Sequence, residues 1–316
     1  MGLPARVTIV DVGPRDGLQN EAAPVSTADK VALVHALQDA GLREIEVTSF
    51  VSPKWVPQMA DNAAVMAAIN RRSGVRYSVL TPNLKGLEGA LPGRPDEIVV
   101  FAAASEAFSR RNINCSIAES IERFEPVVQA ARAQGIKVRG AISCAVGCPY
   151  QGEVTAQEVE RVARLMKEIG VQHCGVADTI GVGTPRRVQL AMEQALRHFP
   201  LEEVSGHFHD TYGQALANIY ACLELGVHHY DTSVAGLGGC PYAKGATGNV
   251  ATEDVVFMLD GLGVETGIDL DRLVDAGAAI TRVLGRPPVS RVARAILARR
   301  TSAEAASCAG SAAPVA

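Results

Sequence analysis

Two histidines with a single residue between them have the spacing of a metal-binding pair. His207 and His209 belong to the segment GHFHD, residues 206–210, whose alternating pattern is typical of a β-strand. Residues two apart in a strand point to the same face, about 6.6 Å apart, so both imidazoles can reach one ion. The segment therefore predicts a metal site at the end of a strand.

Two oxygen donors elsewhere in the chain would complete such a site. Asp16 follows a strand-like run near the N-terminus, and Asn249 ends a glycine-rich loop. Two nitrogen and two oxygen ligands leave positions open for substrate on an ion that prefers six ligands, which favours Mg²⁺ or Mn²⁺. Zinc is the rival ion, because imidazole and carboxylate also form catalytic zinc sites. The plainer alternative is that the two histidines are polar core residues hydrogen-bonded to their neighbours.

Cys240 lies in the same glycine-rich loop, GLGGCPYAKGATGN, residues 236–249. A lone cysteine is usually a small, buried, structural side chain. With Gly238, Gly239 and Pro241 around it, however, this loop is a poor core element and a good lid for an active site. We therefore predict that the Cys240 thiol is catalytic.

Charged residues at strand ends predict the rest of the catalytic site. Arg15 directly precedes Asp16, and its permanently charged guanidinium could hold a developing enolate or carboxylate oxygen. Glu46 lies within an apolar strand and would cost several kcal/mol to bury unpaired, so we expect it to contact Arg15 or a metal-bound water. For Arg15 the alternative is a surface ion pair, and for Glu46 it is an internal salt bridge without a catalytic role.

Three side chains are predicted to contact the substrate. Arg15 and Gln19 share the loop after the first strand, and Asp178 ends the sixth. In a parallel barrel the carboxyl ends of the strands carry the active site, so these positions face the reaction. A purely structural role is again the alternative for Asp178.

Short β-branched runs that alternate with helix-patterned segments must position these residues. The expected strands are residues 7–12, 44–49, 76–81, 97–105, 137–143, 174–179, 204–210 and 229–236. The expected amphipathic helices include residues 26–41, 116–135, 155–170, 184–199, 213–226 and 251–263.

Eight βα units in about 260 residues match the size of a (β/α)₈ TIM barrel. An open doubly wound sheet is the alternative, which the absence of G-x-G-x-x-G after the first strand disfavours. Residues 269–285 predict one extra C-terminal helix. We expect a single TIM-barrel catalytic domain over residues 1–300 and a disordered tail of small and polar residues over 301–316.

Composition limits the class of protein. The 316 residues are 47 % hydrophobic and 20 % charged with a formal net charge of −4, as in a soluble globular protein without an electrostatic reason to bind nucleic acid. No apolar stretch reaches the roughly 18 residues of a membrane span, and the N-terminus lacks signal-peptide features. Seven cysteines form an odd set, which argues against a disulfide framework. We expect a cytoplasmic protein with reduced thiols and no membrane partner.

Several motifs resemble those of the hydroxymethylglutaryl-CoA lyase family. The similarity covers about Val7 to Leu284, and its segments are VGPRDGLQNE, EVTSFVSPKWVPQMAD, ISCAVGCPY, DTIGVGTP, HFHDTYGQALAN and GLGGCPYAKGATGNVATEDVVFML. The resemblance implies a TIM barrel, a divalent cation, often a homodimer, and cleavage of 3-hydroxy-3-methylglutaryl-CoA to acetoacetate and acetyl-CoA. That reaction belongs to leucine degradation and ketone-body formation.

The resemblance also implies residue roles. Asp16, His207, His209 and Asn249 would hold the metal, Arg15 would bind the thioester side of the acyl-CoA, and Cys240 would be the catalytic loop thiol. His207 or Asp16 is the candidate base for the substrate hydroxyl. The chain departs from the family pattern at Phe208, where relatives often have cysteine, and at Ala22-Ala23, where many have a lysine. The alternation of a strand points Phe208 away from the metal site.

Three alternative functions use the same residues. One is a lyase for a longer branched 3-hydroxyacyl-CoA. Another is a condensing synthase of the alkylmalate or homocitrate type, although those enzymes usually carry a long C-terminal regulatory domain and this chain ends soon after the expected barrel. The third is a non-catalytic barrel that binds acyl-CoA, which the full set of metal ligands disfavours.

Overall fold

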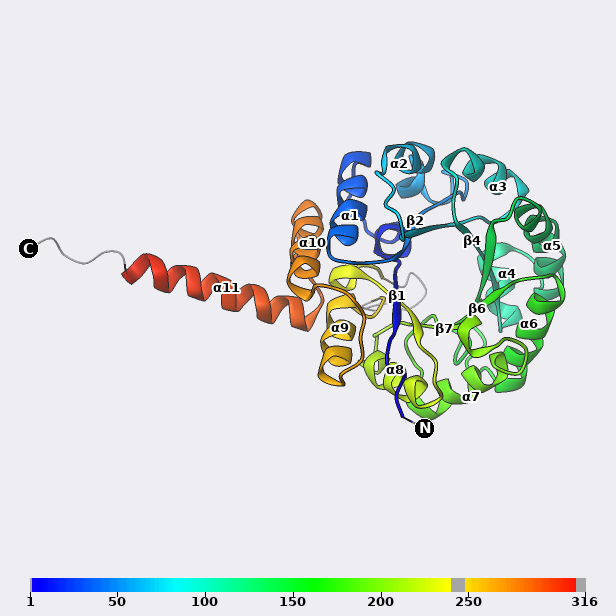
Figure 1. Ribbon diagram of the computed structural model, residues 1–316. Helices are drawn as coiled ribbons and strands as arrows, with labels where there is room; N and C mark the ends of the chain where they lie inside the picture. Colours follow the sequence, from blue (N-terminus) through cyan, green and yellow to red (C-terminus); the bar gives the residue numbers. More distant parts are fainter. Residues whose placement is uncertain (1, 240–247, 311–316) are drawn as a thin grey trace, which may run out of the picture.

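Eight parallel strands close into a barrel in a computed structural model, which describes residues 2–239 and 248–310 (Figure 1). Neighbouring strands pair in chain order, and the last strand pairs back onto the first in register, Thr8 with His229 and Asp11 with Thr232. The prediction of a (β/α)₈ TIM barrel is therefore confirmed. The strands are β1 Thr8–Asp11, β2 Glu44–Ser49, β3 Arg76–Leu80, β4 Glu97–Ala103, β5 Lys137–Ser143, β6 His173–Asp178, β7 Val204–Phe208 and β8 His229–Thr232.

Helices surround this barrel. They are α1 Thr27–Asp39, α2 Asn62–Ala68, α3 Leu84–Ala90, α4 Glu106–Ile113, α5 Ile117–Ala133, α6 Ala156–Glu168, α7 Pro185–Ala195, α8 Ala215–Glu224, α9 Thr252–Gly261, α10 Leu270–Val283 and α11 Arg291–Gly310. Short helical turns are η1 Gly13–Gly17, η2 Pro57–Met59, η3 Leu91–Gly93, η4 Leu201–Glu203 and η5 Val234–Gly236. Each expected helix is present, whereas the short α2, α3 and α4 were not predicted.

Local capping explains where the helices begin. The Ser26 hydroxyl accepts a hydrogen bond from the Asp29 backbone nitrogen at the start of α1, as its position before the helix indicated. Helices α5 and α6 start with capping boxes, in which Glu119 and Glu158 each bond back to the N-cap residue. Gly41 follows α1 with φ +100°, a conformation that favours glycine.

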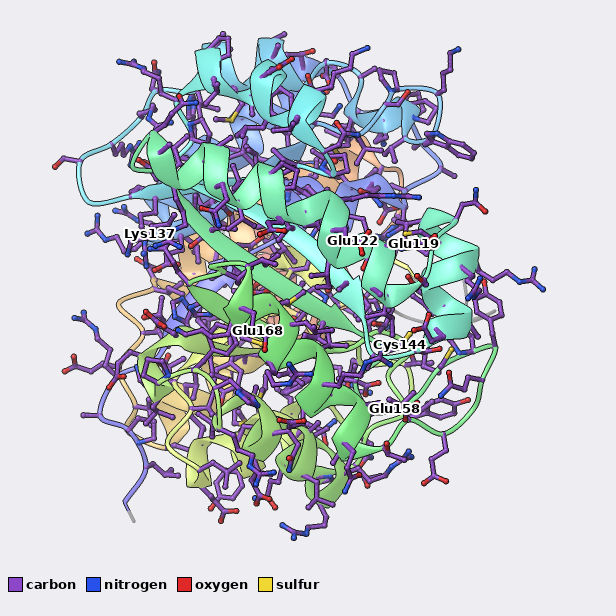
Figure 2. The ribbon with its side chains drawn as sticks, turned by 90° about the vertical axis from the view of Figure 1, so that its right-hand side faces the viewer. Glu119, Glu122, Lys137, Cys144, Glu158 and Glu168 are labelled. Atoms are coloured by element: carbon purple, nitrogen blue, oxygen red, sulfur yellow. The ribbon has the colours of Figure 1, made fainter. Side chains whose placement is uncertain are left out.

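The carboxyl ends of the strands and the starts of the helices meet at one end of the barrel. Figure 2 shows Glu119 and Glu158, at the starts of α5 and α6, near the same end as Cys144, which directly follows β5. Lys137, at the start of β5, lies at the other end. Side chains at the carboxyl ends of the strands therefore share one face, where TIM barrels carry their active sites.

The C-terminal region differs from the expected tail. Helix α10 is the extra helix that residues 269–285 predicted, and α11 continues well beyond it, away from the barrel (Figure 1). The Asp254 carboxylate holds the start of α11, since it accepts hydrogen bonds from the Ser290 hydroxyl at 2.6 Å and the Val292 nitrogen at 2.9 Å. Helix α11 ends at Gly310, so residues 301–310 are helical in this structure, whereas disorder was expected. This segment is rich in alanine, which has a high helix propensity. Residues 311–316 lie outside the described residues.

Among the described helices, none is long and apolar enough to cross a membrane.

Candidate metal and catalytic site

The turn η1 presents Arg15 and Asp16 directly after β1. Glycines at both ends of the turn permit a close approach to the segment after β8. A Cβ atom at Gly17 would lie 2.8 Å from the Leu237 Cβ and from the Ser233 hydroxyl, and one at Gly13 would lie 2.7 Å from an Asp11 carboxylate oxygen. This packing places the two charged residues at the mouth of the barrel.

Asp16, His207 and His209 converge at this mouth. Each offers one possible ligand atom, and these atoms all lie within 4.8 Å of one another. The Asp16 Oδ2 and His207 Nε2 atoms are 3.9 Å apart, and the two imidazole centroids are 5.5 Å apart. Two ligands of one Mg²⁺ ion can be separated by at most about 4.2 Å, so the first distance is compatible with a shared ion. The pair of histidines therefore points to one face, as the alternation predicted.

His209 has the properties expected of a metal ligand. Its Nδ1 atom is buried and has no hydrogen-bond partner among the described residues. Burial, and then the neighbouring His207, lowers the pKa of His209 to about 4, so its imidazole is neutral at pH 7 and carries a lone pair. An uncompensated buried acceptor is costly, and a bound cation would satisfy it.

Asn249 lies beside the same three residues. It forms an isolated antiparallel bridge with His209, and its side-chain nitrogen lies 2.8 Å from Asp16 Oδ2. Rotation of the amide by half a turn would place its carbonyl oxygen in that position, since the two amide atoms are nearly alike in shape. Asp16, His207 and His209 therefore form a candidate site for a divalent cation, and Asn249 lies next to it.

The Asp16 carboxylate is ionised in this setting. Burial alone would raise its pKa, but the charges of Arg15, His207 and His209 outweigh burial and lower the pKa to about 2. The oxygen that faces His207 is thus an anionic donor at any pH near neutrality.

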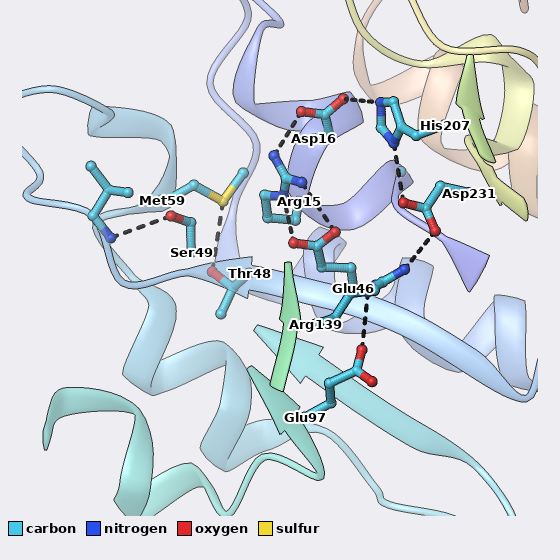
Figure 3. Close-up of polar contacts among 12 residues, drawn as sticks. Arg15, Asp16, Glu46, Thr48, Ser49, Met59, Glu97, Arg139, His207 and Asp231 are labelled. Atoms are coloured by element: carbon cyan, nitrogen blue, oxygen red, sulfur yellow. Dashed lines mark hydrogen bonds and ion pairs between the residues drawn. The ribbon is translucent and has the colours of Figure 1, made fainter. Parts of the chain in front are cut away.

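Arg15 is held by two carboxylates. Its Nε and Nη2 atoms donate to the two Glu46 oxygens at 2.8 and 3.1 Å, and its Nη1 atom donates to Asp16 Oδ1 at 2.7 Å (Figure 3). Glu46 is only 1 % exposed, so the guanidinium neutralises a buried charge and is itself fixed in orientation. The predicted contact between Glu46 and Arg15 is confirmed. The alternative of an exposed surface ion pair is wrong for Arg15.

A cavity of about 1520 Å³ opens beside these groups. Arg15, Asp16, Gln19, His207 and His209 all line it, so the expected metal and substrate residues share one space. Drug-sized ligands occupy pockets of roughly 300–1,000 Å³, so this cavity has room for a larger molecule.

Asp178 does not line this cavity. Gly175 and Ala177 of β6 and Thr179, which directly follows the strand, line the cavity, so the alternation of the strand turns Asp178 to the other face. Its carboxylate accepts hydrogen bonds from the Val182 and Gly183 nitrogens at 3.1 and 2.7 Å. In this structure the Asp178 side chain orders the turn after β6, and the expected substrate contact stays a prediction.

The glycine-rich loop is described only at its two ends. Gly239 lines the cavity on one side, and Asn249 lies at the candidate metal site on the other. Cys240, the predicted catalytic thiol, lies outside the described residues.

Sequence reasoning missed two buried charges that line the same cavity. Asp231 contacts His207, and Arg139 contacts Asp231 across the barrel. The available signal was the one used for Glu46, a charged residue within a strand whose neighbours are buried.

Three comparisons place the chain among known proteins. The HMGL-like family model matches residues 6–280. A Pseudomonas aeruginosa protein named 3-hydroxy-3-isohexenylglutaryl-CoA/hydroxymethylglutaryl-CoA lyase is 58 % identical, over 95 % of this chain and 100 % of its own length. A crystal structure of hydroxymethylglutaryl-CoA lyase from P. aeruginosa has the same identity and coverage with a TM-score of 0.92. The structure of an HMG-CoA lyase from Acinetobacter baumannii, in complex with coenzyme A and 3-methylmalate, has 34 % identity, 92 % and 95 % coverage and a TM-score of 0.88.

Proposed function

Because this chain belongs to the HMGL-like family, we propose that it is a hydroxymethylglutaryl-CoA lyase, which cleaves 3-hydroxy-3-methylglutaryl-CoA to acetoacetate and acetyl-CoA in leucine breakdown. The observation that carries the proposal is the cluster of Asp16, His207 and His209 beside Arg15, at the wall of a large cavity. Cation ligands and a fixed guanidinium in one space are what the cleavage of a 3-hydroxyacyl thioester requires.

In this proposal Asp16, His207, His209 and Asn249 hold Mg²⁺ or Mn²⁺. The bound ion supplies Lewis-acid chemistry, which makes a substrate hydroxyl easier to deprotonate. Of the two candidate bases that line the cavity, Asp16 is the one proposed to take the hydroxyl proton, because the His207 Nδ1 atom faces Asp231 and its Nε2 atom faces the cation site. The bond between the hydroxyl-bearing carbon and the carbon next to the thioester then breaks, and the released electron pair becomes an enolate on the thioester side.

Arg15 and Cys240 act on that enolate. The Arg15 guanidinium, which Glu46 holds in place, donates hydrogen bonds to the thioester oxygen as negative charge develops there. Cys240 then delivers a proton to the departing carbon, which yields acetyl-CoA. This role is supported by the two described ends of the loop, because Gly239 lines the cavity and Asn249 contacts Asp16.

The outer part of the cavity suits a coenzyme A thioester. Lys85, Arg111 and Arg123 line its rim and carry positive charge, which the phosphates of the coenzyme would neutralise. Gln19 lines the same cavity and is proposed to contact the acyl group.

One coupled assay tests the proposed function. Acetyl-CoA release from 3-hydroxy-3-methylglutaryl-CoA should require a divalent ion, fall to background with a chelator, and return when Mg²⁺ or Mn²⁺ is added. Release of free thiol from acetyl-CoA plus a keto acid, without lyase activity, would instead support a condensing synthase. Metal retention without turnover of any acyl-CoA would support a binding protein.

A longer branched substrate is a second candidate. Part of the cavity wall is apolar and partly formed by small residues, and Ala177 lies beside His207 in the sheet; these residues are Leu80, Val99, Phe101, Ala141, Gly175 and Ala177. An alkyl branch larger than methyl could lie there. Comparing kcat/KM for 3-hydroxy-3-methylglutaryl-CoA and its isohexenyl analogue tests this, and Ala177→Leu should reduce activity on the larger substrate more strongly.

We further propose a cytoplasmic homodimer. The described cysteines, Cys115, Cys144, Cys148, Cys174 and Cys222, are free thiols, as a reducing compartment keeps them. The dimer is carried over from the family resemblance. Light scattering on the purified protein would measure the assembly directly.

A further inference from the structure

A line of buried charges continues from the candidate metal site into the barrel. It runs from His207 to Asp231, then to Arg139 and finally to Glu97 (Figure 3). Asp231 and Arg139 are 9 % and 4 % exposed. The proposed chemistry uses neither of them, so their function has to be sought in what they hold.

His207 and Asp231 are neighbours by construction of the sheet. The register of β7 and β8 pairs them directly, so both side chains lie on the inner face of the barrel. The Nδ1 atom of His207 is 3.2 Å from Asp231 Oδ2. An ionised carboxylate can only accept, so Nδ1 carries the proton and donates it. The Nε2 atom, which faces Asp16, is then the atom that can bind a cation.

Arg139 determines which oxygen of Asp231 remains for His207. It reaches from β5 across the barrel, and its Nη1 atom donates to Asp231 Oδ1 at 2.6 Å. Its Nε atom makes a 3.1 Å ion pair with Glu97 Oε1, which anchors the other side of the guanidinium. Arg139 keeps its charge under all ordinary conditions, so it keeps Asp231 ionised and fixed in rotation.

We propose that Asp231, held by Arg139, is a positioning residue that fixes the tautomer and orientation of His207 so that Nε2 faces the cation site. This inference rests on the proposed metal-dependent function. Hydrogen-bonded partners of metal ligands commonly act this way, and their loss lowers metal affinity by about 10- to 100-fold. A barrel-stabilising ion pair alone would leave metal affinity unchanged.

The substitution Asp231→Asn gives a sharp test. Arg139 can only donate, so it would hold the amide oxygen of the new side chain and turn the amide NH₂ group toward His207. Nδ1 would then have to accept, which moves the imidazole proton to Nε2, the atom that faces the ion. We expect the Kd for Mn²⁺, measured by calorimetry on the full-length protein, to rise about 10- to 100-fold.

Two further variants separate positioning from stability. Glu97→Gln removes the other partner of Arg139 and leaves the contact between Asp231 and His207 in place. It should therefore change the Kd for Mn²⁺ by less than about threefold, much less than the rise expected when His207 loses its own partner. Asp231→Asn combined with Arg139→Met and Glu97→Gln removes the three buried charges together, so that Glu97 is not left without its partner, and frees the amide oxygen to accept from His207. This combined variant should therefore fold and should bind Mn²⁺ more tightly than Asp231→Asn alone.

A spectroscopic measurement on the metal-free protein completes the test. ¹⁵N-histidine NMR should show the proton of His207 on Nδ1 in the wild type and on Nε2 in Asp231→Asn. A folded Asp231→Asn protein with wild-type Kd and an unchanged tautomer would overturn the inference. So would a combined variant that folds but binds Mn²⁺ no more tightly than Asp231→Asn alone. Wild-type protein that binds Mn²⁺ yet cleaves no acyl-CoA would contradict the proposed function while leaving the positioning role intact.

Discussion

Replacement of Arg15 by methionine should abolish most of the turnover while leaving substrate binding nearly intact. Arg15 lines the cavity and is held by Glu46 and Asp16. The N–H groups that do not bond to these carboxylates therefore have a fixed orientation before the substrate binds. A donor of this kind strengthens its interaction only as charge develops on the thioester oxygen. Loss of one such donor costs about 3–4 kcal/mol of transition-state stabilisation, which corresponds to a decrease of about 10²- to 10³-fold in kcat.

The same substitution also leaves Glu46 without its partner, and a second variant separates the two effects. Glu46 is 1 % exposed, and removal of one member of a buried pair typically costs about 3–5 kcal/mol of stability. The double variant Arg15→Met with Glu46→Gln should recover thermal stability, because the unpaired charge is gone. It should not recover turnover, because no donor replaces the guanidinium.

The assay is acetyl-CoA release at saturating Mg²⁺, with kcat and KM determined for the wild type, Arg15→Met and the double variant. Recovery of kcat to within tenfold of the wild type in the double variant would falsify the transition-state role. Arg15 would then serve only to neutralise Glu46. A large rise in KM with kcat unchanged would make Arg15 a substrate anchor.

Other perturbations address separate parts of the site and the fold. Cys240→Ala should retain metal and substrate binding but lower kcat by orders of magnitude, and near-wild-type turnover would exclude the thiol as proton donor. Asp16→Ala should lower both kcat and Mn²⁺ affinity, whereas wild-type affinity by calorimetry would remove it from the ligand set. Burial raises the pKa of the Glu253 carboxyl from 4.5 to about 8, so the folded protein retains a proton there that the unfolded chain has lost. The free energy of unfolding should therefore decrease as the pH rises through that window, by about 1.4 kcal/mol per pH unit from this group. Urea unfolding at pH 5.5 and 7.5 should show that Glu253→Gln reduces this decrease, and an unchanged slope would contradict a buried neutral carboxyl.

The barrel was predictable because its strands and longer helices carry strong local patterns. Every expected strand is present, although several end earlier than expected, as with β7, which ends at Phe208 rather than Asp210. Helices α2, α3 and α4 span only seven or eight residues, too few to establish a 3.6-residue period. The helical residues at the end of α11 were missed because small polar composition was given more weight than the helix propensity of alanine.

The sequence predicted those parts of the candidate site for which a local pattern is sufficient. His207 and His209 share a strand face, and the buried charge of Glu46 requires a partner, so the sequence alone indicated both features. Asp178 was predicted to contact the substrate from its place at the end of a strand, whereas the alternation along β6 places Ala177, and not Asp178, at the cavity wall.

Local sequence patterns do not predict which charged residues pair across the barrel. Arg139 and Asp231 are 92 residues apart in the chain, and their contact depends on the closure of the barrel. No periodicity within either strand identifies the partner of such a residue. Their role therefore became visible only from the three-dimensional arrangement.

Asp16, His207 and His209 are proposed to bind one divalent cation together. Crystals of the full-length protein grown with Mn²⁺ would test it through anomalous scattering. We expect a single strong anomalous peak within roughly 2.0–2.6 Å of a side-chain atom from each of the three residues. A peak elsewhere in the cavity, with these three side chains bonded only to protein, would contradict it.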